Sequence, residues 1–248
     1  MRTLRLQARV ENELLKVSRR PDGSPEIFHS IQGEGSNIGK PAVFLRLCLC
    51  NLACVWCDTK YTWDWEQYEP KEQMIEMSDE DVENEIMQHN CKHLIVTGGE
   101  PTLQQKHLIH LLRHLRDRGF TIEIETNGTI VPDSEIVTSV QHWNVSPKLE
   151  SSGNLRLKRE VSQVYEFFRR LSSANFKYVV NDESDFAEIQ SLVSKYNLDP
   201  EKVILMPQAH DSVTLLERSR WLVELCVKEG YRFSTRLQVL LWGNARGI

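Results

Sequence analysis

The sequence predicts an α/β domain with a mainly parallel sheet. Short apolar segments of strand length alternate with amphipathic segments of helix length from about residue 43 almost to the C-terminus. Repeated strand-helix units of this kind join parallel strands through right-handed crossovers. A chain of 248 residues with 40% hydrophobic residues is also large enough for a barrel-sized core. We therefore expect one α/β domain over residues 1–248.

The first half of the repeat holds three predicted strands, over residues 43–47, 94–96 and 120–124, where apolar residues run together or alternate. Ser78 and Asp81 resemble a capping box, which predicts a helix directly after them. A second helix is predicted over the leucines of residues 108–115. Gly119 is a suitable residue to end it.

The second half continues the alternation. Its predicted strands cover residues 142–145, 176–180, 203–206 and 233–241. Its predicted helices cover a short segment near 133–140, the apolar positions of 161–171, a segment behind Ser184, and a last segment that ends at Gly230.

Residues 1–24 form a basic extension ahead of this repeat. Residues 1–20 carry six basic side chains against Glu11 and Glu13, which is compatible with a targeting or binding arm. Apolar and polar residues alternate over residues 4–10, however, and the pattern resumes at Leu15 and Val17. This alternation favours a small hairpin with a charged outer face.

Composition restricts the partners. The net charge of -5 gives no general reason to expect a nucleic-acid partner. No apolar run approaches the length of a membrane span, and the N-terminus lacks the apolar core of a signal peptide. We therefore expect a cytoplasmic protein that binds neither nucleic acid nor membrane.

Three cysteines, Cys50, Cys54 and Cys57, are spaced as C-x3-C-x2-C. Three close thiolates can hold an iron-sulfur cluster while leaving one iron without a protein ligand. An open position of this kind is typical of catalytic metal sites, whereas structural sites are closed.

Structural zinc is the main alternative for this motif. Its fourth ligand would then come from one of four nearby residues, Cys48, Cys91, His89 or His93. A disulfide framework is disfavoured, because six cysteines are few for a chain of 248 residues. We expect Cys48, Cys91 and Cys226 to be buried thiols.

Polar or glycine-rich clusters follow five of the predicted strands. Since the carboxyl ends of parallel strands converge on one face of an α/β barrel, these clusters should share a pocket. They are the cysteine motif and residues 97–100, 125–128, 146–148 and 206–208.

The cysteine motif, followed after the next strand by Gly98-Gly-Glu-Pro101, resembles the radical S-adenosylmethionine (SAM) superfamily. Further matches at residues 26–35, 39–46, 56–59 and 125–128 resemble its 7-carboxy-7-deazaguanine synthase family, and the likeness extends from about residue 25 to the C-terminus. The resemblance implies a partial (β/α)6 barrel. It also implies a 4Fe-4S cluster on Cys50, Cys54 and Cys57, with SAM on the open iron.

The resemblance also implies a set of SAM-binding residues from four of the clusters. Glycines at the methionine end let backbone groups come close to a ligand. Glu100 would accept a hydrogen bond from the ammonium group. The implied residues are Trp56, Cys57 and Asp58; Gly98, Gly99 and Glu100; Ser146, Pro147 and Lys148; and Met206, Pro207, Gln208 and Ala209.

The substrate that the resemblance implies is 6-carboxy-5,6,7,8-tetrahydropterin, whose ring contracts with loss of ammonia in queuosine biosynthesis. Arg46 suits its carboxylate, because a guanidinium offers a bidentate fork. Ile31, Gln32, Gly33 and Thr97 would contact the pterin, and Thr59 would bind a Mg²⁺ ion beside it. An electron donor such as flavodoxin or ferredoxin and a homodimer are further implications.

Two positions depart from the family pattern. Leu49 stands where a glycine often precedes the first cluster cysteine, and residues 234–242 lack a histidine-lysine pair found in some members. The second departure leaves open whether Arg236 or Gln238 contacts substrate. Residues 61–77 have no assigned role. An activase for a glycyl radical enzyme and a non-catalytic zinc module are the alternative functions.

Overall fold

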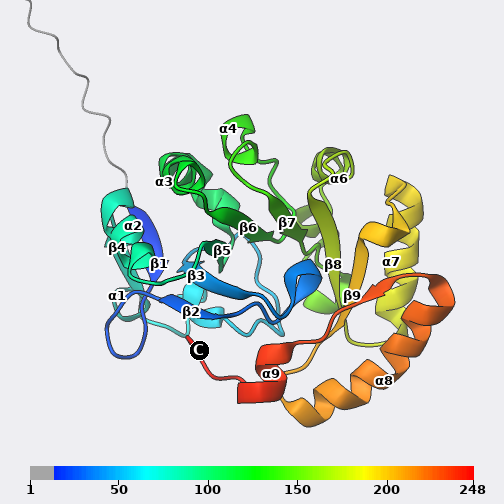
Figure 1. Cartoon of the computed structure of the whole chain (residues 1–248). Helices are drawn as coiled ribbons and strands as arrows, with labels where there is room; N and C mark the ends of the chain where they lie inside the picture. The colour runs from blue at the N-terminus through cyan, green and yellow to red at the C-terminus, as the bar shows by residue number, and fades with distance from the viewer. Residues whose placement is uncertain (1–13) are drawn as a thin grey trace, which may run out of the picture.

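The computed structural model describes residues 14–248, which form an α/β fold around one twisted sheet (Figure 1). Neighbouring main strands pair in parallel and follow the order of the sequence. They are β3 (Pro41–Leu47), β5 (His93–Gly98), β6 (Thr121–Thr126), β7 (His142–Val145), β8 (Ala174–Val180) and β9 (Val203–Pro207). The predicted fold class is therefore confirmed.

Shorter strands flank this parallel core, and the sheet does not close on itself. β2 (Ile27–Ile31) and β1 (Leu15–Ser18) both pair with β3 in the antiparallel sense. β4 (Met74–Met77) continues the sheet beyond β1. The result is a partial barrel. The hairpin expected near residues 4–17 falls largely on residues 1–13, outside the described part of the chain.

The helices lie in an arc outside the strands (Figure 1). None of them, within residues 14–248, is long and apolar enough to cross a membrane. The longer ones are α2 (Asp79–Met87), α3 (Gln105–Asp117), α6 (Ser162–Phe168), α7 (Glu183–Tyr196) and α8 (Ser212–Glu229). The short ones are α1 (Pro70–Gln73), α4 (Ser134–Val137), α5 (Arg156–Arg159) and α9 (Leu237–Trp242).

Local sequence signals explain most of these boundaries. The Ser78 side chain accepts a hydrogen bond from the Asp81 amide and so caps α2, as predicted. Gly119 and Gly230 adopt positive φ just after α3 and α8. Asp182 caps α7 by accepting from the Ser184 amide, so the helix begins slightly earlier than its predicted start behind Ser184.

The predicted strand over residues 233–241 is wrong. Only Arg232–Phe233 pairs with β9, as β10, and the chain then turns into the helix α9. The apolar run is too short for its periodicity to distinguish a strand from a helix. Long-range contacts decide the outcome, since the Leu237 amide donates to the Gly33 carbonyl and Arg236 binds Glu34.

Candidate active site

The carboxyl ends of the parallel strands open into one cavity of about 510 Å³, and all five sequence clusters reach it. The prediction of a shared pocket is therefore confirmed. The predicted site residues that line it are Ile31, Gln32, Gly33, Arg46, Cys50, Cys54, Trp56, Cys57, Asp58, Thr59, Thr97, Gly98, Gly99, Ser146, Lys148, Met206 and Gln208.

Four predicted SAM contacts, Glu100, Pro147, Pro207 and Ala209, are buried without lining this pocket. Glu100 is the clearest case, because its side chain has no exposed surface. Its oxygens accept hydrogen bonds from Thr102, from the Thr126 hydroxyl at 2.8 Å and from the Asn127 amide at 2.6 Å. Glu100 thus holds two strand-end turns together, and the structure does not place it where an ammonium group in the pocket would meet it.

Each cysteine of the motif has an N–H donor directed at its sulfur. The Asn154 Nδ2 lies 3.2 Å from the Cys54 Sγ, and the Trp63 Nε1 lies 3.3 Å from the Cys57 Sγ. The Asn127 Nδ2 lies 3.8 Å from the Cys50 Sγ. Donors of this kind stabilise thiolates and tune the potential of an iron-sulfur cluster. The donor set therefore fits a cluster bound by three cysteines.

The residues considered as a fourth zinc ligand lie elsewhere. Cys48, Cys91, His89 and His93 do not line the pocket. Cys48 has no exposed surface, its sulfur faces the Gln73 carbonyl at 3.6 Å, and burial raises its pKa to about 12. His93 lies 3.3 Å from Glu123 instead. Cys48 and Cys226 are buried thiols as predicted, whereas Cys91 is only partly buried.

The glycine pair lets the cysteine loop pack tightly against β5. A Cβ added to Gly98 would lie 2.0 Å from the Leu47 carbonyl oxygen, and one added to Gly99 would lie 2.0 Å from that of Leu49. Leu49 itself has φ of 73°. This left-handed conformation costs a residue with a side chain about 1–2 kcal/mol, which explains why glycine suits the position. Here a leucine occupies it.

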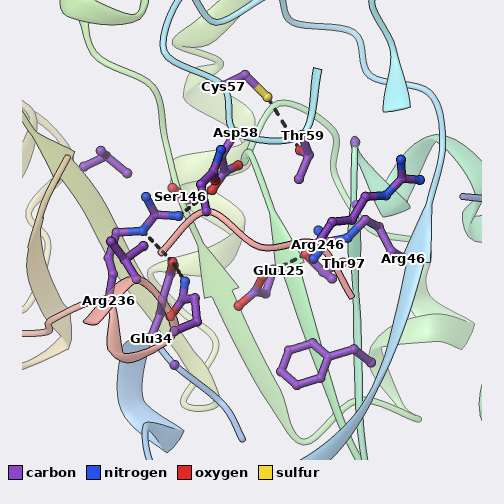
Figure 2. Close-up of a pocket in the computed structure, with 18 of the residues that line it drawn as sticks. Glu34, Arg46, Cys57, Asp58, Thr59, Thr97, Glu125, Ser146, Arg236 and Arg246 are labelled. Carbon is purple, nitrogen blue, oxygen red and sulfur yellow. Dashed lines mark hydrogen bonds and ion pairs between the residues drawn. The ribbon is translucent and has the colours of Figure 1, made fainter. Parts of the chain in front are cut away.

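Arg46 reaches the pocket from β3 (Figure 2). A buried carboxylate, Glu26, holds its side chain. Its Nε donates to the Glu26 Oε1 at 2.9 Å, and Glu26 has no exposed surface. Although burial opposes it, the neighbouring Tyr61, Glu26 and Asp58 raise the pKa of Arg46 above its usual value. Arg46 is therefore a permanent cation, suited to an anionic ligand.

The C-terminal residues 243–248 also line the pocket. Arg246 fastens them to the opposite wall, with its Nε 3.0 Å from the Glu26 Oε2 and its Cζ 3.5 Å from the centre of the Tyr61 ring. Glu26 therefore joins Arg46 to the end of the chain. No sequence pattern indicates that these distant residues pair.

A second charge cluster surrounds Glu34 on the other side of the pocket (Figure 2). Glu34 accepts from the Lys177 Nζ at 2.5 Å, the Arg236 Nε at 2.9 Å and the Gln238 Nε2 at 2.6 Å. Although burial opposes it, Lys177 and Arg236 hold the pKa of Glu34 well below its usual range. Arg236 also binds Asp58, one residue after the last cluster cysteine.

Glu125 connects this cluster to the predicted substrate residues. Its carboxylate accepts from the Thr97 hydroxyl at 2.7 Å and from the Gln32 Nε2 at 3.2 Å, and it lies 3.9 Å from the Lys177 Nζ. Sequence reasoning assigned no role to Glu34, Glu125 or Lys177. A lysine inside the buried strand β8 was the available signal, because a charge there requires a partner.

Comparisons with known proteins agree with this geometry. Residues 47–182 match the model of the radical SAM superfamily. The chain is 38% identical over 224 residues to the 7-carboxy-7-deazaguanine synthase of Pyrobaculum aerophilum, covering 90% of this chain and 95% of that protein. The chain belongs to the 7-carboxy-7-deazaguanine synthase family of the radical SAM superfamily.

Other members of the 7-carboxy-7-deazaguanine synthase family give the same result. The Escherichia coli K12 enzyme is 30% identical over 227 residues, or 84% of this chain and 93% of that protein. The crystal structure of QueE from Escherichia coli matches with a TM-score of 0.67 and 27% identity, covering 90% of this chain and 94% of that one. The family likeness thus spans nearly the whole fold, and it favours neither the zinc module nor the activase.

Proposed function

We propose that this chain is a 7-carboxy-7-deazaguanine synthase. It contracts the ring of 6-carboxy-5,6,7,8-tetrahydropterin to 7-carboxy-7-deazaguanine with release of ammonia, a step of queuosine biosynthesis. One observation carries the proposal: three cysteines with N–H donors share a pocket with a permanently charged arginine, in a chain related to these enzymes over its length.

Cys50, Cys54 and Cys57 would hold a 4Fe-4S cluster. Burial raises the pKa of Cys50 to about 12, so its thiolate needs the positive charge of a metal to form at neutral pH. When bound, the cluster and SAM supply the 5′-deoxyadenosyl radical that removes hydrogen from the substrate. The protein supplies orientation and a dry site. The pocket residues that would contact SAM are Trp56, Asp58, Gly98, Gly99, Ser146, Lys148, Met206 and Gln208.

Substrate recognition divides between the two charge clusters. Arg46 would bind the pterin carboxylate, and Mg²⁺ held by the Thr59 hydroxyl would bind the same group. Ile31, Gln32, Gly33 and Thr97 would meet the ring edge. The carboxylates of Glu34 and Glu125 add acceptors for ring N–H groups, because both line the pocket.

The proposal extends to the setting of the enzyme. Residues 1–248 would form one domain, and the protein would be a homodimer in the cytoplasm. A flavodoxin or a ferredoxin would be its electron donor. The need for a donor follows from the chemistry, because SAM cleavage consumes one electron supplied through the cluster.

The decisive experiment is anaerobic incubation of reconstituted protein with SAM, Mg²⁺, dithionite and 6-carboxytetrahydropterin. We expect ammonia and 7-carboxy-7-deazaguanine in equal amounts. Omitting the pterin is the control for uncoupled SAM cleavage. Continued SAM cleavage without either product would reject the substrate assignment, and colourless protein containing zinc would reject the cluster.

A further inference from the structure

One residue of the cysteine loop and four residues beside it form a surface that we call the loop patch: Val55, Leu155, Arg156, Leu157 and Lys158. Leu157 is 94% exposed, Leu155 is 71% exposed and Val55 is 63% exposed. Exposed apolar residues are ordinary when scattered singly, but adjacent ones mark interaction sites. None of the five lines the pocket, so the patch faces outward.

The loop patch is joined directly to a cluster cysteine. Asn154, which precedes Leu155, donates to the Cys54 Sγ at 3.2 Å and accepts from the Ala53 amide at 2.9 Å. The Val55 amide donates to the Ser152 carbonyl at 3.0 Å, and a Cβ added to Gly153 would lie 2.8 Å from a Val55 methyl group. The two segments therefore pack as one unit, in which Cys54 lies just beneath the surface.

The patch is basic in a chain whose net charge is -5. Lys158 is exposed, and the Arg156 side chain is 68% exposed although its Nε bonds Glu160 at 2.7 Å. The Glu160 side chain is only 5% exposed and also pairs with the Lys195 Nζ, so it offsets only part of the Arg156 charge. The exposed acids on this side are Glu150 and Asp182, which line a second cavity together with Arg156, so the free positive charge of the patch is centred on Lys158. Such a surface complements an acidic partner, because opposite potentials steer association.

We propose that the loop patch is the docking site of a small acidic one-electron carrier protein. The inference rests on the proposed function, which requires one electron per cleavage of SAM. In this step one electron leaves the reduced carrier and enters the cluster held by Cys50, Cys54 and Cys57, and no bond is made or broken. Because the patch lies outside the pocket, the carrier can dock while SAM and substrate occupy their sites.

The test uses the reconstituted chain with a purified flavodoxin and a purified ferredoxin, both acidic. Binding of each oxidised carrier is measured by calorimetry, and cluster reduction by each reduced carrier is followed by stopped-flow absorbance. One or both carriers should bind and reduce the unmodified chain. For such a carrier, Leu157→Glu and Lys158→Glu should each lower the binding affinity and the rate of cluster reduction about tenfold or more. Val227→Glu is the matched control, because Val227 is 80% exposed on α8 and should tolerate the same charge.

Reduction by dithionite separates this proposal from the proposed function. Both variants should cleave SAM normally with dithionite, since a small reductant needs no docking surface. If dithionite supports no formation of 7-carboxy-7-deazaguanine while carrier binding still depends on the patch, the proposed function is rejected and the docking site stands. Unchanged binding and reduction in both variants would overturn the docking site. Failure of both carriers to bind the unmodified chain would also overturn it, and so would dissociation of a dimer by Leu157→Glu without loss of carrier reduction.

Discussion

The two sides of the pocket are built in different ways. The cysteine side is assembled from residues that are close in sequence, so that Cys50, Cys54 and Cys57 come from one loop. The opposite side is closed by pairs such as Glu34 with Arg236, which are 202 positions apart. Chemistry that needs fixed spacing can be read from a sequence, whereas charge pairing across a fold cannot.

The largest expected effect concerns the cysteine side. Cys50→Ala should abolish the cluster, because two thiolates cannot hold it at this site. Cys48→Ala should keep it, since Cys48 is buried away from the pocket. Iron content and colour after anaerobic reconstitution measure the result. Loss of iron from both variants would contradict the three-ligand assignment.

The next effect concerns the opposite side. Arg236→Ala removes one of the two cations beside Glu34 and the partner of Asp58. Leaving buried charge without its partner costs about 3 kcal/mol of unfolding free energy. Urea unfolding measures this cost, and Arg220→Ala, on the exposed face of α8, is the control expected to stay within about 0.5 kcal/mol. Equal stability of the two variants would show that the Glu34 cluster does not hold the C-terminal segment.

Acid should also weaken the Glu34 side of the pocket. The pKa of Glu34 is lowered from its ordinary 4.5, so its contribution to stability is complete above that value and is lost as pH falls toward the folded-state pKa. The free energy of unfolding should therefore decline below pH 4.5. In Glu34→Gln the decline should be shallower. An identical pH slope for the two proteins would mean that other carboxylates account for it.

The smallest effect returns to the cysteine loop. Leu49→Gly should raise the unfolding free energy by about 0.5–1 kcal/mol, because glycine adopts positive φ without strain but loses more entropy on folding. Leu49→Ala keeps the strain and serves as the control. Thermal unfolding of both variants without the cluster measures the effect of backbone strain on the free energy of unfolding. An equal increase in stability for Leu49→Ala and Leu49→Gly would argue against strain.

The sequence predicted those parts of the fold that repeat along the chain. Strands such as β6 and the leucine face of α3 follow from hydrophobic periodicity. The helix predicted near residues 133–140 shortens to Ser134–Val137, although Val140 beyond its end is also buried. The strand expected near Val239 became a helix, since contacts with Gly33 and Glu34 override local preference.

Some residues of the site could likewise be predicted from short sequence patterns, whereas others depend on long-range contacts. The motif cysteines, the glycine pair and Arg46 were found because each belongs to a short pattern with a chemical meaning. Glu100 belongs to such a pattern too, yet its hydrogen bonds join its own turn to the one after β6, and no spacing rule distinguishes these bonds from contact with a ligand. The roles of Lys177, in β8, and of Arg236, just before α9, required knowledge of which segments meet across the pocket.

The location of residues 243–248 in the wall of the pocket matters for the expression and purification of the protein. Ile248 lines the pocket, and Arg246 fixes the preceding residues against Glu26. An affinity tag fused after Ile248 would be delivered to the entrance of the cavity, where it would compete with ligands for space and disturb the anchor. A cleavable C-terminal tag should therefore be judged by whether its removal restores ligand affinity.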